Sequence, residues 1–296
     1  MITIPFIKDK YSGLELCLVG ADLYRLGRYE VAFQCFDEVL EIDPMDIKAW
    51  NKKASILSDL GIFEVALKCY DEALKIKSDD VMTLNAKGDV LDKLGDPEKA
   101  IECYNKALEI YPKDFYAWYN KGNALAKLEK IEDALECFNK AIELDPWDES
   151  AWNNKGLALH NLDRHEEALE CFDNSLKINP EFASAWSNKG FALGCIGKYE
   201  DALECFNKSL EINPESDSAW SNKGFALHDL GKYEDAIECF DKAIELDPEN
   251  VDAWLSKGNS LEELGKIEEA INCYNRALEI EPDYKEAKEG LNRCKG

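Results

Sequence analysis

A ten-residue stretch, Ser-Ala-Trp-Ser-Asn-Lys-Gly-Phe-Ala-Leu, occurs twice in this chain, at residues 184–193 and again at 218–227. The two copies are displaced by 34 residues, and Leu16 and Leu84 occupy two further places at the same spacing. Looser copies place a tryptophan at the remaining places: Trp50, Trp118, Trp152 and Trp254. A fixed period of this length is typical of stacked repeats, in which each repeat packs only on its neighbours. We therefore expect no single central core.

The formal charge of −25 restricts the partners of the chain. Unaided binding to nucleic acid, or to an anionic membrane surface, needs clustered Lys and Arg, so neither is expected. A basic or neutral protein partner remains open. The first seven residues lack the features of a signal peptide, and no apolar run reaches the length of a membrane span. Together with eleven cysteines, these features predict a cytoplasmic location.

The period divides the chain into eight units between an N-terminal extension, residues 1–12, and a C-terminal capping helix, residues 285–296. The units are 13–46, 47–80, 81–114, 115–148, 149–182, 183–216, 217–250 and 251–284. We number the positions of each unit from 1 to 34. Lys288 takes the place of the repeated Trp in the last segment, which suits a polar helix that covers an open apolar end.

Each unit reads as two helices. Positions 4, 8 and 11 carry Trp, Gly and Leu, a spacing that puts them on one helical face. Position 15 is glycine in six units, which predicts a left-handed residue after the first helix. Position 20 is always Ala and position 24 always Phe or Tyr, which predicts the buried stripe of a second helix. Pro at position 32, in all units but the second, ends that helix.

This pattern resembles the tetratricopeptide repeat, whose signature is Trp-x2-Leu-Gly-x2-Tyr, then Ala-x3-Phe, then Pro, over 34 residues. The resemblance covers residues 13–284. Two departures recur: Lys replaces Leu at position 7 in seven units, and Leu replaces Tyr at position 11 in all eight. The resemblance implies an all-α, right-handed superhelical solenoid of stacked antiparallel hairpins. It also implies that the first helices line a concave groove and that the chain is a non-enzymatic protein-interaction module.

Cysteine occupies position 23 of every unit, from Cys35 to Cys273. Neighbouring hairpins stack at about 8–10 Å, whereas a disulfide needs Cα atoms within about 7 Å. This ladder is therefore expected to be buried packing, with neither disulfide nor metal. Cys17, Cys195 and Cys294 lie off the ladder, and Cys294, near the C-terminus, is expected to react first with an alkylating agent.

The histidines do not suggest catalysis. His160 and His228 share position 12 but lie two repeats apart, which places them about 20 Å from each other. His165 lies at the corner between two helices, and the spacing suggests no catalytic pair. We expect no cofactor. The lysines at position 7 are expected to pack their alkyl chains and to reach water or a neighbouring glutamate, such as the Glu at position 18.

The resemblance assigns positions 2, 5, 6, 9 and 12 to the concave groove. In the fourth to seventh units none of these twenty side chains is Asp, Glu, Lys or Arg, although those types make up 32% of the chain. The neutral strip predicts a binding surface for an extended, non-acidic peptide. The candidate residues are Tyr116, Tyr119, Asn120, Asn123, Asn154, Asn188, Phe191, Asn222 and Phe225.

Asparagine stands at position 6 of these four units and resembles the asparagine ladder of O-linked N-acetylglucosamine transferases, which holds a peptide backbone. An amide both donates and accepts hydrogen bonds, as a peptide backbone requires. The carboxylate clamp of chaperone-binding members of the family fits poorly, because its cationic residues are missing. The alternative function is a self-associating scaffold with no dedicated peptide ligand.

Overall fold

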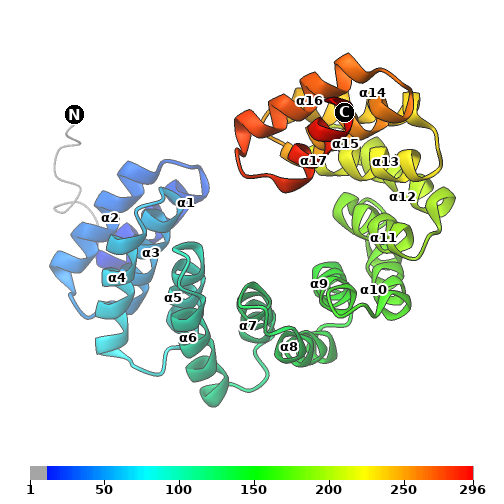
Figure 1. Ribbon diagram of the computed structural model, residues 1–296. Helices are drawn as coiled ribbons and strands as arrows, with labels where there is room; N and C mark the ends of the chain where they lie inside the picture. The colour runs from blue at the N-terminus through cyan, green and yellow to red at the C-terminus, as the bar shows by residue number, and fades with distance from the viewer. Residues whose placement is uncertain (1–11, 296) are drawn as a thin grey trace. The chain divides into compact units, whose positions relative to one another are not determined.

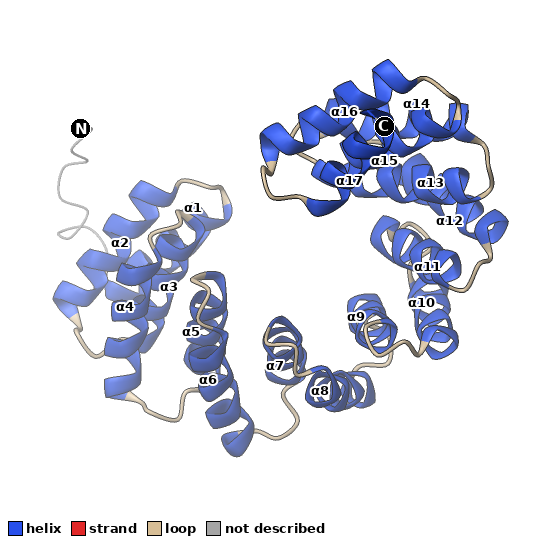
Figure 2. Ribbon diagram, viewed as in Figure 1, coloured by secondary structure: helices blue, strands red, loops and turns tan. Residues whose placement is uncertain are grey.

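The computed structural model describes residues 12–295, so the predicted N-terminal extension lies, apart from Ser12, outside the described residues. Within residues 12–295 all regular secondary structure is helical (Figures 1 and 2). The helices are α1 (Gly13–Arg25), α2 (Tyr29–Ile42), α3 (Ile47–Asp59), α4 (Phe63–Ile76), α5 (Val81–Lys93), α6 (Pro97–Ile110), α7 (Phe115–Lys127), α8 (Ile131–Leu144), α9 (Glu149–His160), α10 (His165–Ile178), α11 (Ala183–Cys195), α12 (Tyr199–Ile212), α13 (Asp217–Asp229), α14 (Tyr233–Leu246), α15 (Val251–Glu263), α16 (Ile267–Ile280) and α17 (Lys285–Lys295).

Helices α1 to α16 form eight antiparallel pairs, each made of an odd-numbered first helix and the even-numbered second helix that follows it. Most first helices begin with a side-chain cap at position 34 of the preceding unit. The Asp46 carboxylate, for example, accepts a hydrogen bond of 3.0 Å from the Ala49 backbone N–H. Such a cap satisfies one of the N–H groups that a helix leaves without an internal partner.

The first helices end as the sequence predicts. The six glycines at position 15 all adopt positive φ, between 70° and 80°. They therefore provide the left-handed turn into the second helix at little steric cost. In the fourth and fifth units the same position holds Glu129 and Asp163, which adopt the same turn with φ of 57°.

In every pair except α3–α4, where position 8 is Ala54, the core is a ring pressed onto a glycine. A Cβ added to Gly224 would lie 2.6 Å from the Phe240 ring, a distance at which atoms clash. Within a compact unit the ring at position 24 also packs with the residue at position 10 of the next repeat, as Phe206 does with Ala226. The aromatic core is thus shared between neighbours, as expected for a linear array of repeats.

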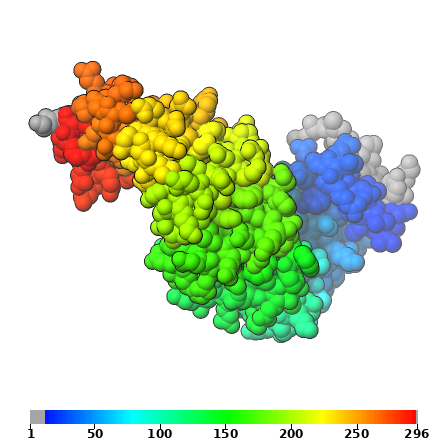
Figure 3. Space-filling model, turned by 90° about the vertical axis from the view of Figure 1, so that its right-hand side faces the viewer, coloured from blue at the N-terminus to red at the C-terminus, as the bar shows by residue number. Residues whose placement is uncertain are grey.

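The helices divide into two compact units between Pro146 and Trp147. The first contains α1 to α8 and the second α9 to α17. In the second unit, the successive hairpins follow one another as bands from green to red in the space-filling view (Figure 3). Helix α17 packs on α15 and α16 with Ala287 buried, and Gly290 lies against the Tyr274 ring. It therefore covers part of the last hairpin.

Candidate functional site

A hollow of about 320 Å³ lies in the second compact unit, on the face formed by positions 2, 5, 6, 9 and 12 of its first helices. We call this surface the first-helix face and the hollow the first-helix pocket. Its wall consists of Phe191, Gly194, Cys195, Tyr199, Phe206, Asn222, Phe225, Ala226 and Asp229. Three of these, Phe191, Asn222 and Phe225, are candidate residues from the sequence, so the fold brings them together.

The pocket exists because position 12 of α11 is glycine. Apart from its chain neighbours and the backbone of its own helix, no atom of residues 12–295 lies within 4 Å of the place where a Cβ of Gly194 would be, so the space above this residue is open. The rings of Phe191 and Phe225, both at position 9, stand beside it and are 45% and 39% exposed. Phe191 rests on the His160 ring at 5.0 Å between ring centroids, and Phe225 on the Phe240 ring at 5.4 Å. Packing therefore holds both rings in place while leaving one side of each exposed.

The polar groups of the pocket lie on α12 and α13. The Tyr199 hydroxyl interacts with the Asp229 carboxylate, and this polar contact together with the aspartate charge raises the pKa of Tyr199. Among the described residues the Asn222 amide has no hydrogen-bond partner, so both its donor and its acceptor are available. The arrangement suits binding through apolar contact and an amide.

The other predicted asparagines of this unit are engaged with a neighbour. The Asn188 amide donates to the Asn153 side-chain oxygen at 2.9 Å, and Asn153 donates to Asn154 at 3.1 Å. Position 5 does not offer its side chain to a ligand in these repeats, because Asn153 and Ser221 are buried. The expectation that position 5 lines the groove is therefore wrong for these two residues.

The remaining candidates lie on α7, in the first compact unit. The Tyr116 side chain is 69% exposed, with its ring edge-on to Phe115 at 5.5 Å. Tyr119 stacks on Phe115 at 5.8 Å and lies 6.3 Å from Phe138, so it is partly engaged in packing. The last two candidates on this helix, Asn120 and Asn123, are half-buried.

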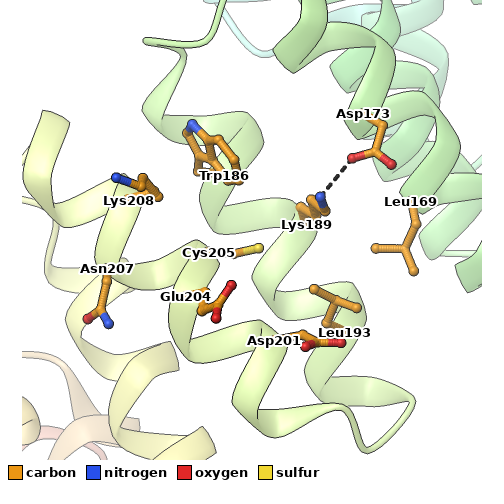
Figure 4. Close-up of a pocket in the computed structure, with 10 residues that line it drawn as sticks. All are labelled: Leu169, Asp173, Trp186, Lys189, Leu193, Asp201, Glu204, Cys205, Asn207 and Lys208. Atoms are coloured by element: carbon orange, nitrogen blue, oxygen red, sulfur yellow. Dashed lines mark ion pairs between the residues drawn. The ribbon is translucent and has the colours of Figure 1, made fainter.

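A larger hollow of about 660 Å³ lies on the opposite side of the second unit, between the second helices α10 and α12 and above α11 (Figure 4). The Lys189 ammonium contacts the Asp173 carboxylate of the preceding repeat at 2.7 Å and lies 5.6 Å from the Trp186 ring centroid. The predicted glutamate at position 18 is therefore not its partner. Position 25 supplies an aspartate instead, because that position faces the lysine across the interface between repeats.

The same ion pair recurs wherever position 25 of the preceding repeat is aspartate within a compact unit. The pairs are Lys53 with Asp37, Lys87 with Asp71, Lys189 with Asp173 and Lys257 with Asp241. The neighbouring indole N–H donates to the carbonyl of the proline six residues earlier, for example from Trp186 to Pro180 at 2.8 Å. Because these polar groups satisfy one another, we assign this hollow to the joint between repeats rather than to a ligand.

The histidines differ from the sequence prediction. Nδ1 of His160 and Nδ1 of His165 lie 3.2 Å apart across the turn between α9 and α10, within hydrogen-bond distance. The Asp163 carboxylate lies 3.9 Å from the other ring nitrogen of His165. Burial and the His165 charge lower the pKa of His160. Within residues 12–295 no three His, Cys, Asp or Glu side chains are placed to share a metal ion.

The cysteine ladder is buried, as predicted, and all eleven thiols are free. Burial raises the pKa of each ladder thiol, for example to about 11 at Cys205. Which of the remaining three thiols reacts first stays a prediction, and their exposure differs. Cys195 is exposed on the wall of the first-helix pocket, whereas Cys294 is half-buried because α17 packs it against the last hairpin.

Protein-family models identify most of the chain as repeats of one family. Models described as "Tetratricopeptide repeat" match residues 47–80, 81–114, 115–148, 150–182, 183–216, 218–250 and 251–284. The chain belongs to the tetratricopeptide repeat family. Repeats of this kind typically form scaffolds for protein–protein interaction. Among curated proteins, no relative matches the chain.

Solved structures of the family share the fold. A chain of the APC/C hetero-tetramer Cut9–Hcn1 aligns over 97% of this chain with a TM-score of 0.71 and 17% identity, and this chain spans 57% of its length. YrrB, described as a TPR protein with an unusual peptide-binding site, aligns over 65% of this chain and 99% of its own, with a TM-score of 0.52 and 25% identity. PilF of Pseudomonas aeruginosa aligns over 72% of this chain and 97% of its own, with a TM-score of 0.64 and 22% identity.

No helix among the described residues has the length and the apolar character needed to cross a membrane.

Proposed function

We propose that this protein is a non-enzymatic interaction module that binds an extended, non-acidic segment of another protein on the first-helix face of its second compact unit. The observation that carries the proposal is the pair of half-exposed rings, Phe191 and Phe225, beside the unpartnered Asn222 amide. Apolar walls with a few placed polar groups are typical of binding sites. We also propose a cytoplasmic location, which the free thiols support.

The asparagines contribute unequally to the proposed site. Asn222 is free to pair with both the C=O and the N–H of a bound backbone. Asn188 uses one amide hydrogen on the buried Asn153, so it supports the repeat interface as well as any ligand. The exposed Tyr116, with Tyr119, Asn120 and Asn123, gives the fourth repeat a neutral surface of the same chemical kind in the first compact unit. YrrB, which is described as having a peptide-binding site, supports the proposal by its likeness in fold.

Selection of displayed random 12-residue peptides on the full-length chain tests the proposal. We expect peptides whose binding is lost in the variant Phe191→Ala/Asn222→Ala/Phe225→Ala. A neutral hydrogen bond contributes about 0.5–1.5 kcal/mol, and every 1.4 kcal/mol is about tenfold in affinity. With the loss of two apolar contacts added, binding should weaken at least about a hundredfold.

The matched control replaces three exposed asparagines of second helices by alanine, namely Asn207, Asn272 and Asn275. It removes the same kind of amide from the other face, so the selected peptides should bind it as they bind the parent chain. Circular dichroism shows whether each variant keeps its helices. Equal peptide binding by the parent chain and the first-helix variant would refute the proposed site.

A further inference from the structure

We infer that the bound segment carries a large apolar side chain, which enters the first-helix pocket, and Lys or Arg residues a few positions away, which lie toward α15 and α17. The inference rests on the proposed function and specifies the chemistry of the partner. Two neighbouring features of the second compact unit carry it: an open aromatic pocket, and an adjoining surface with an excess of carboxylates.

The pocket suits one large apolar side chain. Its volume of about 320 Å³ lies at the lower end of the range of about 300–1,000 Å³ that is common for ligand sites. Phe191 and Phe225 form its sides, and the buried ring of Phe206 contributes to its wall. An aromatic or long aliphatic side chain placed above Gly194 would cover the exposed parts of these rings, which water now contacts.

The polar rim of the pocket is acidic. The Asp229 carboxylate interacts with the Tyr199 hydroxyl. An ionised carboxylate has about four lone-pair positions, so most of its capacity remains for a donor from a ligand. A Lys or Arg side chain of the bound segment would form the strongest hydrogen bond to this carboxylate, because charge on both partners strengthens the bond relative to that of a neutral donor.

The negative charge continues on the neighbouring helices. A hollow of about 390 Å³ between α13, α15 and α17 is lined by His228, Leu255, Asn259, Glu262, Glu263, Glu286, Glu289 and Arg293. Its one lining cation, the Arg293 guanidinium, is committed to both oxygens of Glu262 at 3.0 and 2.8 Å. The remaining glutamates include Glu263 and Glu286, which have no ion-pair partner among the described residues. This surface therefore favours a basic ligand and repels an acidic one.

The distance between the two features sets the spacing in the ligand. Both hollows include residues of α13, so they are neighbours along the stack. Packed helices lie about 8–10 Å apart, so one to two helix spacings cover about 8–20 Å, and one extended residue spans about 3.3–3.6 Å. We therefore expect the first Lys or Arg about three to six residues from the apolar side chain.

The peptide selection described above tests this inference when its products are sequenced. We expect enrichment of Trp, Phe or Leu at one position and of Lys or Arg three to six positions away. Fluorescence anisotropy with a selected, dye-labelled peptide should show at least tenfold weaker binding to Gly194→Leu. That variant fills the pocket at a helical position where no atom lies within 4 Å. Ser58→Leu places the same side chain at position 12 of the second repeat and should leave binding unchanged.

The charge requirement is measured with Glu263→Gln/Glu286→Gln. Affinity should fall several-fold and depend less on salt, because screening acts on the charges that the variant removes. Glu268→Gln/Glu269→Gln, on the second helix α16, changes the charge equally and serves as the control. Selected peptides that need Asn222 but show no apolar–basic pattern, or that bind Gly194→Leu normally, would overturn this inference and leave the proposed function intact. A selection that yields no peptide dependent on the first-helix face would overturn both.

Discussion

At the scale of single residues, two repeats have a residue other than glycine in the left-handed conformation at position 15, which costs conformational energy. Glu129 and Asp163 adopt positive φ where six other repeats have glycine. A left-handed conformation costs a residue with a Cβ about 1–2 kcal/mol, and less for Asp, whose short side chain can hydrogen-bond to the local backbone. The fourth and fifth repeats therefore carry strain at the end of their first helices.

We predict that Glu129→Gly raises the free energy of unfolding by about 0.5–1 kcal/mol, because the relief of strain exceeds the entropy that glycine adds to the unfolded chain. Asp163→Gly should raise it less. The midpoint of urea unfolding at constant m-value measures the effect. Gly231→Glu is the reverse control and should lower the midpoint. A lower midpoint for Glu129→Gly would contradict the explanation.

The His160–His165 pair predicts a dependence of stability on pH. The folded-state pKa of His160 is lowered, first by burial and then by His165, with Asp163 acting in the opposite direction. Above the unfolded-state pKa of about 6.5, His160 is neutral in both the folded and the unfolded chain. The pair then makes its full contribution to the free energy of unfolding. As pH falls below that value, the unfolded state binds the proton first, so stability falls.

The urea midpoint of the parent chain should therefore decrease between about pH 7 and pH 5, a range above the ordinary titration of carboxylates. His160→Gln should flatten the curve in that range, since it removes the group whose pKa shifts. His228→Gln, at the same position two repeats later, is the control, because Nδ1 of His228 lies 2.9 Å from the Ser260 hydroxyl rather than beside a second imidazole. A parent curve that is flat between these pH values would refute the prediction.

At the scale of the element, neighbouring hairpins are joined by a repeated set of polar contacts. The lysine at position 7 lies near the indole ring at position 4 and pairs with the aspartate at position 25 of the preceding repeat. Lys223 has the indole, at 5.2 Å from the Trp220 ring centroid, but the preceding repeat supplies Asn207. The joint between the sixth and seventh repeats therefore lacks the aspartate carboxylate that Asp173 and Asp241 supply at two neighbouring joints.

We predict that Asn207→Asp completes this joint and raises the urea midpoint by the equivalent of about 0.2–1 kcal/mol, the value of a partly exposed ion pair. Asp173→Asn should lower it by a similar amount, since it removes the pair with Lys189. Repeating Asn207→Asp in a Lys223→Met background separates the pair from the added negative charge. The gain should disappear there; an unchanged gain would show that no pair had formed.

The helices and their buried stripes could be predicted from sequence because both depend on local spacing. Gly224 and Phe240 illustrate this, since a glycine and a ring at fixed positions already imply close helices. Contacts between repeats were harder to predict. The sequence suggests water or a neighbouring glutamate, such as that at position 18, as the partner of Lys189, although the aspartates and asparagines at position 25 contain the signal. Finding it requires knowing which positions face each other across the joint.

The candidate site was predictable only in part. Phe191, Asn222 and Phe225 were found from their position on the first helix, and they line one pocket. The cause of the pocket is Gly194, and its opening depends on the neighbouring repeat, which one helical face cannot reveal. The pairing of His160 with His165 was missed for a similar reason, because a turn with positive φ at Asp163 brings the two rings together.

At the scale of the whole molecule, stability is spread along a linear series of hairpins rather than held in one core. Each aromatic core belongs to one hairpin and its neighbour, as the cluster around Phe206 and Ala226 shows. In such an array the free energy of unfolding is approximately the sum of a contribution from each repeat and one from each interface between neighbouring repeats. Damage to one repeat should therefore remain near that repeat.

Trp220→Ala tests this locality. The half-buried indole donates to the Pro214 carbonyl at 3.0 Å and packs beneath Lys223. Loss of its partial burial and of one hydrogen bond should cost about 2–4 kcal/mol. Amide hydrogen exchange should then become faster in α12 to α15, which adjoin the change, and stay as in the parent chain in α1 to α6. Tyr116→Ala, which removes a ring that is 69% exposed, should leave exchange nearly unchanged throughout. Equal acceleration in α1 to α6 and α12 to α15 would mean that the chain unfolds as one cooperative body, in which case the additive description would be wrong.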